Sequence, residues 1–350
     1  MTPNPLTGVL FHWLGGLASA SFYVPYKRIR GWSWEIFWLT GGFFSWVIAP
    51  WLFASLQTND LLSVLSNTPT NVLLWCYFWG AMWGMGGLAF GLTMRYLGLS
   101  LGMAVALGLT TVLGTMGPPI FRGTVAELWN TTSGQIVFIG IAVVLVGIAV
   151  IALAGSAKEK QLSAGGGATD RGEFNLKKGL VLAVFSGVMS SCFAFGLDAG
   201  ESIREASFAA GTSASWKGLP VLCVILAGGF TTNLIWCSYL IWSNKSAQQF
   251  FKPTLAHQPL GINYFFAALG GTLWYFQFFF YTLGESQMGR FGFSSWTLHM
   301  ASIILFSTLW GFALSEWKGT TRNTKLTVWV GILILVSSTV LIGWGNSLSV

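Results

Sequence analysis

Long apolar runs separated by short polar segments dominate this chain of 350 residues. A bilayer core about 30 Å thick needs roughly 20 apolar residues for each spanning helix. Ten runs of that kind lie near residues 8–24, 34–56, 72–94, 97–120, 134–154, 178–198, 216–242, 261–283, 292–314 and 326–345. The pattern therefore predicts an all-α integral membrane protein with ten transmembrane helices.

Composition supports this interpretation. Only 8% of the residues are Asp, Glu, Lys or Arg and 53% are hydrophobic, whereas an average globular chain carries about 25% charged residues. This excludes cytosolic enzymes and secreted disulfide scaffolds, and lipid bilayer is the expected surrounding. The formal net charge of +7 does not indicate nucleic-acid binding, because the basic residues end the apolar runs and form no stripe. The cysteines lie inside the runs and are interpreted as packing residues.

The basic residues also predict the topology, because cytoplasmic loops of membrane proteins are enriched in Lys and Arg. No cleavable signal is expected before the first run, since Met1 to Thr7 carries no basic residue. If the N-terminus is outside, fourteen of the 18 basic residues fall on the inner side. The outer side then receives Arg122, Arg204, Lys217 and Arg290. We therefore expect both termini in the periplasm.

A hydrophilic, Gly-rich stretch divides the chain into two halves of five predicted helices. It predicts a first repeat over 1–154, a cytoplasmic, flexible linker over 155–177 and a second repeat over 178–350. Because five is odd, two related halves must insert with opposite orientation, as in many secondary transporters. Two constant offsets match small residues of the halves, pairing Gly8 with Gly179, Gly16 with Gly187, Gly84 with Gly270 and Gly98 with Gly284.

Polar side chains inside the apolar runs are the best candidates for a binding site, because they are costly there. His12 and Tyr23 share a face of the first run, and Trp274, Gln277 and Tyr281 share a face of the eighth. Asn233 and His299 lie within the seventh and ninth runs. An aromatic ring beside amide and hydroxyl groups suits a sugar, which stacks its C–H face and hydrogen-bonds its hydroxyls. Helix packing is the alternative for each residue.

Proton coupling needs a group that changes protonation as the protein changes sides. The candidates are His12, Glu35, Asp198 and His299. Glu35 has a structural alternative, since it could cap the start of the second run. Glu285 and Arg290 flank the outer junction of the eighth and ninth runs and are candidates for a gating ion pair. No phosphate-binding loop, metal-ligand spacing or paired nucleophile and base is found, so neither an enzyme nor a cofactor or metal is expected.

Several segments are too specific to be a general membrane pattern. They include Asn175 to Val184, Trp274 to Tyr281 and Ser295 to Met300. Over nearly the whole chain, these segments resemble the bacterial L-rhamnose/proton symporter family of the drug/metabolite transporter superfamily. The resemblance departs around residues 86–89, 202–216 and 285–294.

The resemblance implies import of L-rhamnose, or the similar L-lyxose or a related deoxyhexose, across the bacterial inner membrane, driven by the proton gradient. It also carries over Trp83 as a substrate-binding candidate, with Lys27 and Arg95 as gating candidates. Two alternatives stay open: an exporter or facilitator of another small metabolite with the same fold, and a membrane-embedded sugar sensor. The sequence leaves the oligomeric state and the proton-carrying residue open.

Overall fold

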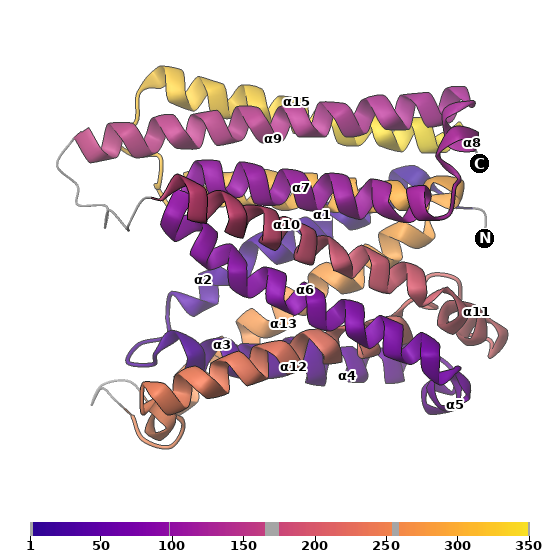
Figure 1. The fold of residues 1–350 in the computed structure, drawn as a ribbon, viewed down its shortest axis with the longest axis horizontal. Coiled ribbons are helices and arrows are strands. Elements are labelled where there is room, and N and C mark those ends of the chain that lie inside the picture. The colour runs from indigo at the N-terminus through magenta and orange to yellow at the C-terminus, as the bar shows by residue number, and fades with distance from the viewer. Residues whose placement is uncertain (1–2, 98, 165–174, 254–258, 349–350) are drawn as a thin grey trace.

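A computed structural model describes residues 3–97, 99–164, 175–253 and 259–348 of the chain. Within these ranges the chain is helical and contains no β-strand, so the prediction of an all-helical fold is confirmed. The long helices run side by side along the longest axis of the molecule (Figure 1). Two ends of this bundle can be defined. The terminal end holds the first residue of α1 (Pro5–Ser21) and the last of α15 (Arg322–Ser347), and the linker end holds the far end of α9 (Thr132–Ala164).

Each of the ten predicted runs falls on a long helical segment. Besides α1, α9 and α15, these are α6 (Thr70–Leu97), α7 (Leu99–Phe121), α10 (Leu176–Ala199), α12 (Leu219–Ser243), α13 (Leu260–Ser286), α14 (Ser295–Ala313) and the pieces around residues 34–57. Within the described residues, seven helical segments are long and apolar enough to cross a membrane, and α1, α7 and α13 are not among them. The chain is thus a multi-pass membrane protein by length and composition.

The second predicted run is built from three continuous pieces. These are α3 (Trp34–Phe43), a π-helical turn η1 (Phe44–Ile48) and α4 (Ala49–Gln57). Pro50 is the second residue of α4 and has no backbone N–H to donate to the carbonyl four residues earlier. The hydrogen-bond ladder widens to the π pattern in the turn just before that proline, which is where such a rearrangement is expected.

Short helices and turns connect the long ones. At the terminal end these are α5 (Leu61–Asn67), α8 (Val125–Trp129), α11 (Glu201–Ala209) and η3 (Gly289–Ser294); α2 (Tyr23–Tyr26) and η2 (Ser246–Phe250) lie toward the linker end. Helix α9 continues to Ala164, so the first ten residues of the predicted flexible linker are helical. Residues 165–174 lie outside the described part. Asn175 then begins α10, because its side chain accepts a hydrogen bond from the backbone N–H of Lys178.

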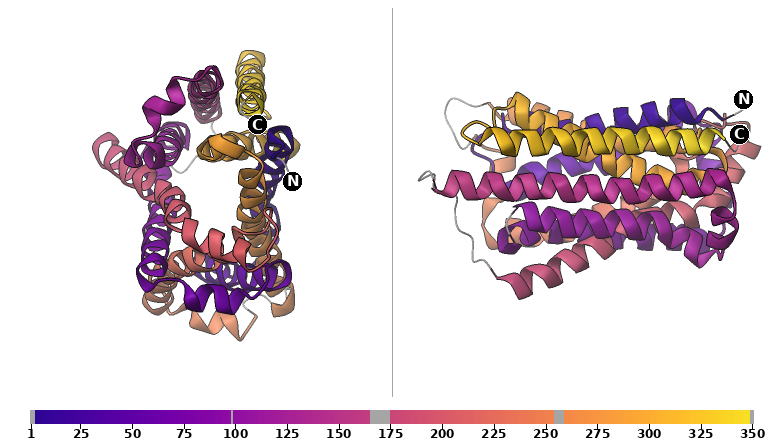
Figure 2. Two further views of the ribbon diagram at one scale, coloured as in Figure 1. Left: turned by 90° about the vertical axis from the view of Figure 1, so that its right-hand side faces the viewer. Right: turned by 90° about the horizontal axis from the view of Figure 1, so that it is seen from above.

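Helices of the two halves interleave in the core. Helix α1 packs on α13 and α14, α10 packs on α6 and α7, and α12 packs on α6. Helices α9 and α15 pair along one edge of the bundle (Figures 1 and 2). Glycines permit the closest of these approaches: a Cβ at Gly80 would collide with the backbone of Ile225, and one at Gly228 with the backbone of Tyr77. This interleaving brings α1, α10, α13 and α14 together at the terminal end.

Candidate functional site

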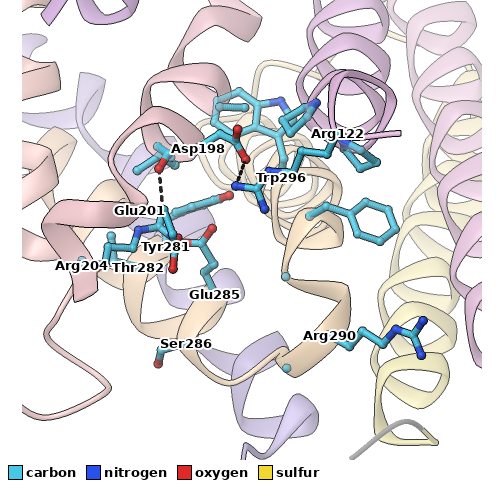
Figure 3. A pocket seen from close by; sticks show the side chains of 18 of the residues that line it. Arg122, Asp198, Glu201, Arg204, Tyr281, Thr282, Glu285, Ser286, Arg290 and Trp296 are labelled. Carbon is cyan, nitrogen blue, oxygen red and sulfur yellow. Dashed lines mark hydrogen bonds and ion pairs between the residues drawn. The ribbon is translucent and has the colours of Figure 1, made fainter. Parts of the chain in front are cut away.

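A cavity of about 570 Å³ opens at the terminal end of the bundle (Figure 3). Both halves of the chain build it. The first half supplies lining residues from α7 and α8. The second half supplies them from α10, α11, α13, η3 and the start of α14. Its volume falls in the range that holds a small organic ligand, and its walls carry several charged side chains.

The charged side chains on the cavity walls are paired. Arg122, the residue after α7, pairs with Asp198 near the end of α10. Arg204 of α11 contacts Glu201 at 3.3 Å and Glu285 of α13 at 3.2 Å. The chain turns at Gly200 between α10 and α11, so Arg204 folds back and donates to the carbonyl of Leu197 at the end of α10, 3.2 Å away. The turn therefore fixes the arginine against the cavity wall.

Glu285 and Arg290, the predicted gating pair, each bind a different partner. Arg290 contacts Glu127 of α8 at 2.6 Å, whereas Glu285 contacts Arg204. The two pairs also differ in environment. The side chains of Arg204 and Glu285 are 12% and 19% exposed, and those of Arg290 and Glu127 are 44% and 70% exposed.

Aromatic rings close the inner part of the cavity. Tyr281 of α13 and Trp296 of α14 both line it, with ring centroids 6.0 Å apart. The indole N–H of Trp296 donates to the carbonyl of Thr110 at 2.9 Å, which holds the ring in place. Behind Tyr281 lie two buried histidines, His12 of α1 and His299 of α14, each with its ring centroid 5.4 Å from that of Tyr281. The two imidazoles are 6.4 Å apart.

Glycines allow this histidine pair to fit between the helices. A Cβ at Gly284 of α13 would collide with the ring of His12, and one at Gly15 of α1 would crowd the carbonyl of Gln277 and touch the ring of His299. The hydroxyl of Ser302 also joins the two helices, donating to the carbonyls of His12 and His299 at 2.8 Å each. The close packing of the helix backbones therefore fixes the positions of the two imidazole rings.

The buried polar atoms around this pair are not all satisfied. Among the described residues, both ring nitrogens of His12, Nδ1 of His299 and Nε2 of Gln277 have no hydrogen-bond partner. Buried polar groups are normally hydrogen-bonded. Unsatisfied donors and acceptors beside an aromatic-lined cavity indicate a site where a hydroxylated ligand can supply the missing bonds.

A second aromatic group lies further along α13. Trp274 precedes Tyr281 by two helical turns, about 10 Å nearer the linker end. Its ring contacts Phe22 at 4.0 Å and Trp38 at 6.0 Å between centroids. The indole of Trp38 donates to Asn233 at 3.0 Å. Tyr23 lies at the margin of this group and is half exposed, and Trp83 joins it through Trp46.

The remaining predicted residues lie away from the cavity or bind other groups. At the linker end, the buried carboxylate of Glu35 accepts hydrogen bonds from Asn244 at 3.1 Å and Ser246 at 2.8 Å, tying α3 to the segment after α12. Lys27 contacts Glu316 at 3.5 Å, also at the linker end. Arg95 lies in α6, but its side chain falls outside the described part. In the described residues, no three His, Cys, Asp or Glu side chains gather to hold a metal ion.

Sequence reasoning missed several residues of the site. Arg204, expected only as one of the four outer basic residues, is mostly buried against Glu285, and Trp296 is not among the predicted site residues although it lines the cavity. Glu316, the common partner of Lys27 and Lys158, was also missed. A signal existed for the first of these, because the predicted topology places the acidic and basic residues around 198–205 and 285–290 on the same side of the membrane.

Comparison with known proteins decides the family. The family model of the L-rhamnose-proton symport protein (RhaT) matches residues 1–348. The chain belongs to the L-rhamnose-proton symporter family. Proteins named L-rhamnose-proton symporter from Mannheimia succiniciproducens and Cronobacter sakazakii are 38% and 37% identical, over 97% and 98% of this chain and 98% of each relative. One from Yersinia pestis is 35% identical over 97% of this chain. Members of this symporter family are transporters, which agrees with the expectation that the chain is not an enzyme.

Proposed function

We propose that this chain imports L-rhamnose together with a proton across the bacterial inner membrane by alternating access. The observation that carries the proposal is a cavity that opens at the terminal end and leads toward buried polar groups without hydrogen-bond partners. The cavity runs from the terminal end to Tyr281 and Trp296, behind which lie the unsatisfied groups of His12, Gln277 and His299. At the linker end, Glu316 joins Lys27 to Lys158 of α9. Its relatives, named L-rhamnose-proton symporters, support the choice of sugar and ion.

Two inverted five-helix repeats and ten spanning helices form part of the proposal. Helix packing supports it: α1 lies on α13 and α14, the third and fourth long helices of the second half, and α10 lies on α6 and α7, their counterparts in the first. The aligned glycines follow the same rule. A Cβ at Gly8 would approach Gly284 near the end of α13, and one at Gly179 would approach Leu97 at the end of α6. Such reciprocal packing is expected of two related halves, and the odd number of helices in each half favours the inverted arrangement.

The proposed topology places the linker end in the cytoplasm and both termini in the periplasm. The fourteen-to-four distribution of basic residues supports it. In this orientation the cavity faces the periplasm, where sugar and proton arrive. The described conformation is then the outward-facing state of the transport cycle.

In the proposed sugar site, the ring stacks near Tyr281 and Trp296, and its hydroxyls bind Gln277, His12 and His299. An imidazole offers both a donor and an acceptor when neutral, and a carboxamide offers both as well. Trp274, with Trp83, Asn233 and Tyr23 around it, forms the next part of the path toward the cytoplasm. The close packing of Trp274 on Phe22 must loosen before sugar can pass.

Uptake of labelled L-rhamnose into energised membrane vesicles tests this function. Vesicles that contain the protein should accumulate the sugar above its outside concentration, and a protonophore should abolish the accumulation. Vesicles without the protein are the control. Accumulation that ignores the protonophore would refute proton coupling, and counterflow of another metabolite in place of L-rhamnose would favour an exporter or facilitator.

A further inference from the structure

A mostly buried ion pair lies on the cavity wall, one helical turn from the proposed sugar site. The carboxylate of Glu285 contacts the guanidinium of Arg204 at 3.2 Å. Glu285 is the least exposed carboxylate among the described ion pairs: its side chain is 19% exposed, against 32% for Asp198 and 43% for Glu201. Both members of the pair line the cavity, so water entering from the terminal end reaches them.

We propose that Glu285 binds the transported proton and that Arg204 is its positioning partner. This inference rests on the proposed function and names the coupling residue within it. The step is a simple protonation: the Glu285 carboxylate takes a proton from periplasmic water in the cavity and becomes a neutral carboxylic acid. It returns that proton to cytoplasmic water after the protein has changed sides. No other bond forms or breaks.

Arg204 has enough other partners to tolerate that change. Removing one member of a buried ion pair is strongly destabilising when it leaves the other charge uncompensated. Here, Arg204 also contacts Glu201 at 3.3 Å and donates to the carbonyl of Leu197 at 3.2 Å. When Glu285 is neutral, the guanidinium therefore keeps one carboxylate and one carbonyl. The pair can open and close without an isolated charge in the protein interior.

The location of Glu285 connects proton and sugar. It follows Tyr281 by four residues, so the two side chains lie on the same face of α13. Tyr281 in turn contacts His12 and His299 with its ring. A sugar that stacks on Tyr281 changes the solvation of Glu285 directly. The charged and titratable groups that interact with Glu285 are Arg204 and Glu201 of α11, Lys217 before α12, and Tyr281 of its own helix.

The other candidates fit the role less well. Glu35 is held by Asn244 and Ser246 at the linker end, away from the cavity. Asp198 pairs with Arg122, whose side chain is 53% exposed. No contact described for Asp198 joins it to Tyr281, His12 or His299. His12 and His299 are the hydrogen-bonding partners that the sugar needs, which favours their remaining neutral.

Two transport modes of reconstituted protein separate this role from a structural one. With one proton per sugar, an imposed difference of one pH unit supports accumulation of about tenfold, because a pH unit and a tenfold ratio are each about 1.4 kcal/mol. Exchange of labelled for unlabelled L-rhamnose at equal pH requires no net proton movement. We expect Glu285→Gln to lose accumulation, with a final ratio of about one, while its exchange stays within about threefold of the parent.

The matched control is Glu205→Gln, which makes the same change at an exposed residue next to Arg204. It should keep both accumulation and exchange. If Glu285→Gln does not fold, the double variant Glu285→Gln with Arg204→Gln removes both charges of the pair and should likewise exchange without accumulating. Accumulation by either variant at the parent's level would overturn the proposal. Loss of exchange together with accumulation in a folded variant would also overturn it and indicate a binding or structural role.

Failure of the proposed function gives a different result. If the parent protein neither exchanges nor accumulates L-rhamnose, the fault lies with the assigned function. If the parent does both and Glu285→Gln does both equally well, only the assignment of Glu285 fails. The pH dependence of exchange adds a further readout, since it should flatten in Glu285→Gln and remain in Glu205→Gln.

Discussion

The two ends of the helical bundle differ in how their charged side chains are placed and in the cavities that they form. At the terminal end, a cavity of about 570 Å³ carries ion pairs on its walls and ends at Tyr281 and Trp296, behind which the buried histidine pair lies. At the linker end, one cavity between α9 and α14 measures about 260 Å³ and is lined mostly by apolar side chains, and a wider hollow of about 920 Å³ lies over the end of α12 and η2. None of the predicted sugar-binding residues lines either of them. There, Glu316 bridges two cationic side chains, and one of them, Lys158, lies over the ring of Trp317.

This contrast teaches how one bundle can offer access from one side at a time. Ion pairs join separate segments at both ends, but those of the terminal end lie around an open cavity, whereas those of Glu316 tie the segment after α14 to α9 and to the residue after α2. Between the two ends, the close packing of Phe22, Trp38 and Trp274 leaves space of only about 10 Å³. A transition to the opposite state has to break the bridges at Glu316 and separate these rings.

The largest effect is expected at the buried histidine pair, which lies behind the inner wall of the cavity. His299→Ala removes an imidazole that the proposed sugar site uses and leaves a gap beside Tyr281. The efficiency of L-rhamnose transport should fall at least about tenfold, the equivalent of about 1.4 kcal/mol. Initial uptake rates at equal expression measure this change. Unchanged kinetics would assign His299 to helix packing and would break the link between the cavity and the site.

The next effect uses two glycines at opposite ends of one helix. In Gly284→Ala, near the terminal end of α13, the new methyl group would displace the ring of His12. Transport should fall about fivefold, the equivalent of about 1 kcal/mol, which is the lower end of what core overpacking costs. Gly261→Ala is the matched control at the linker end of α13, where a new Cβ meets nothing within 4 Å, and its uptake should match the parent. Equal effects of the two changes would contradict the special role of the terminal end.

A smaller effect is expected when the linker end is released. Glu316→Gln removes the anion shared by Lys27 and Lys158, and exposed ion pairs of this kind are worth about 0–1 kcal/mol each. The population that is open toward the cytoplasm should therefore rise about two- to fivefold. Ser45→Cys, a replacement beside Trp38 and Trp274, reports the change, because a thiol reagent reaches it only when these rings separate.

Labelling of that cysteine should be faster when Glu316→Gln is present, with the reagent applied from the cytoplasmic side. Lys318→Gln, a neutralising change nearby in the same segment but outside the described Glu316 pairs, serves as the control and should leave the rate unchanged. A rate unaffected by Glu316→Gln would show that the bridge does not hold the linker end closed.

The smallest effect is expected at the exposed pair of the terminal end. Arg290→Ala breaks the contact with Glu127, whose side chain is 70% exposed. Uptake should change by less than about twofold, because solvent screens such pairs. A loss as large as that expected for His299→Ala would mean that Arg290, an exposed residue of the cavity wall, takes part in sugar recognition. The difference between buried and exposed ion pairs would then be contradicted.

Much of the fold could be predicted from local pattern. The ten apolar runs coincide with long helices because hydrophobic length is a property of consecutive residues. The end of α9 was harder to predict. Residues Gly155 to Ala164 have the composition of a linker, yet the helix continues through them. The π-helical turn before Pro50 depends on how one proline shifts the hydrogen-bond ladder, which the apolar pattern does not reveal.

The candidate site was predictable by residue type and only partly by position. Of the polar groups predicted from the apolar runs, the structure brings His12, Tyr281 and His299 together. Pairings across long stretches of sequence could not be derived. Arg204 and Glu285 meet because α11 folds back over the end of α10, and Glu35 meets Ser246 because α3 and the segment after α12 share an end of the bundle.

One measurement tests the central claim that sugar and proton enter together through the terminal cavity. Right-side-out vesicles carrying Ser286→Cys, a replacement on the cavity wall, are placed in weakly buffered medium, and the external pH is recorded when L-rhamnose is added. The account predicts a rise in external pH, which a bulky impermeant thiol reagent applied outside abolishes. Entry of labelled L-rhamnose without any pH rise, or a rise that survives full modification of the cysteine, would contradict it.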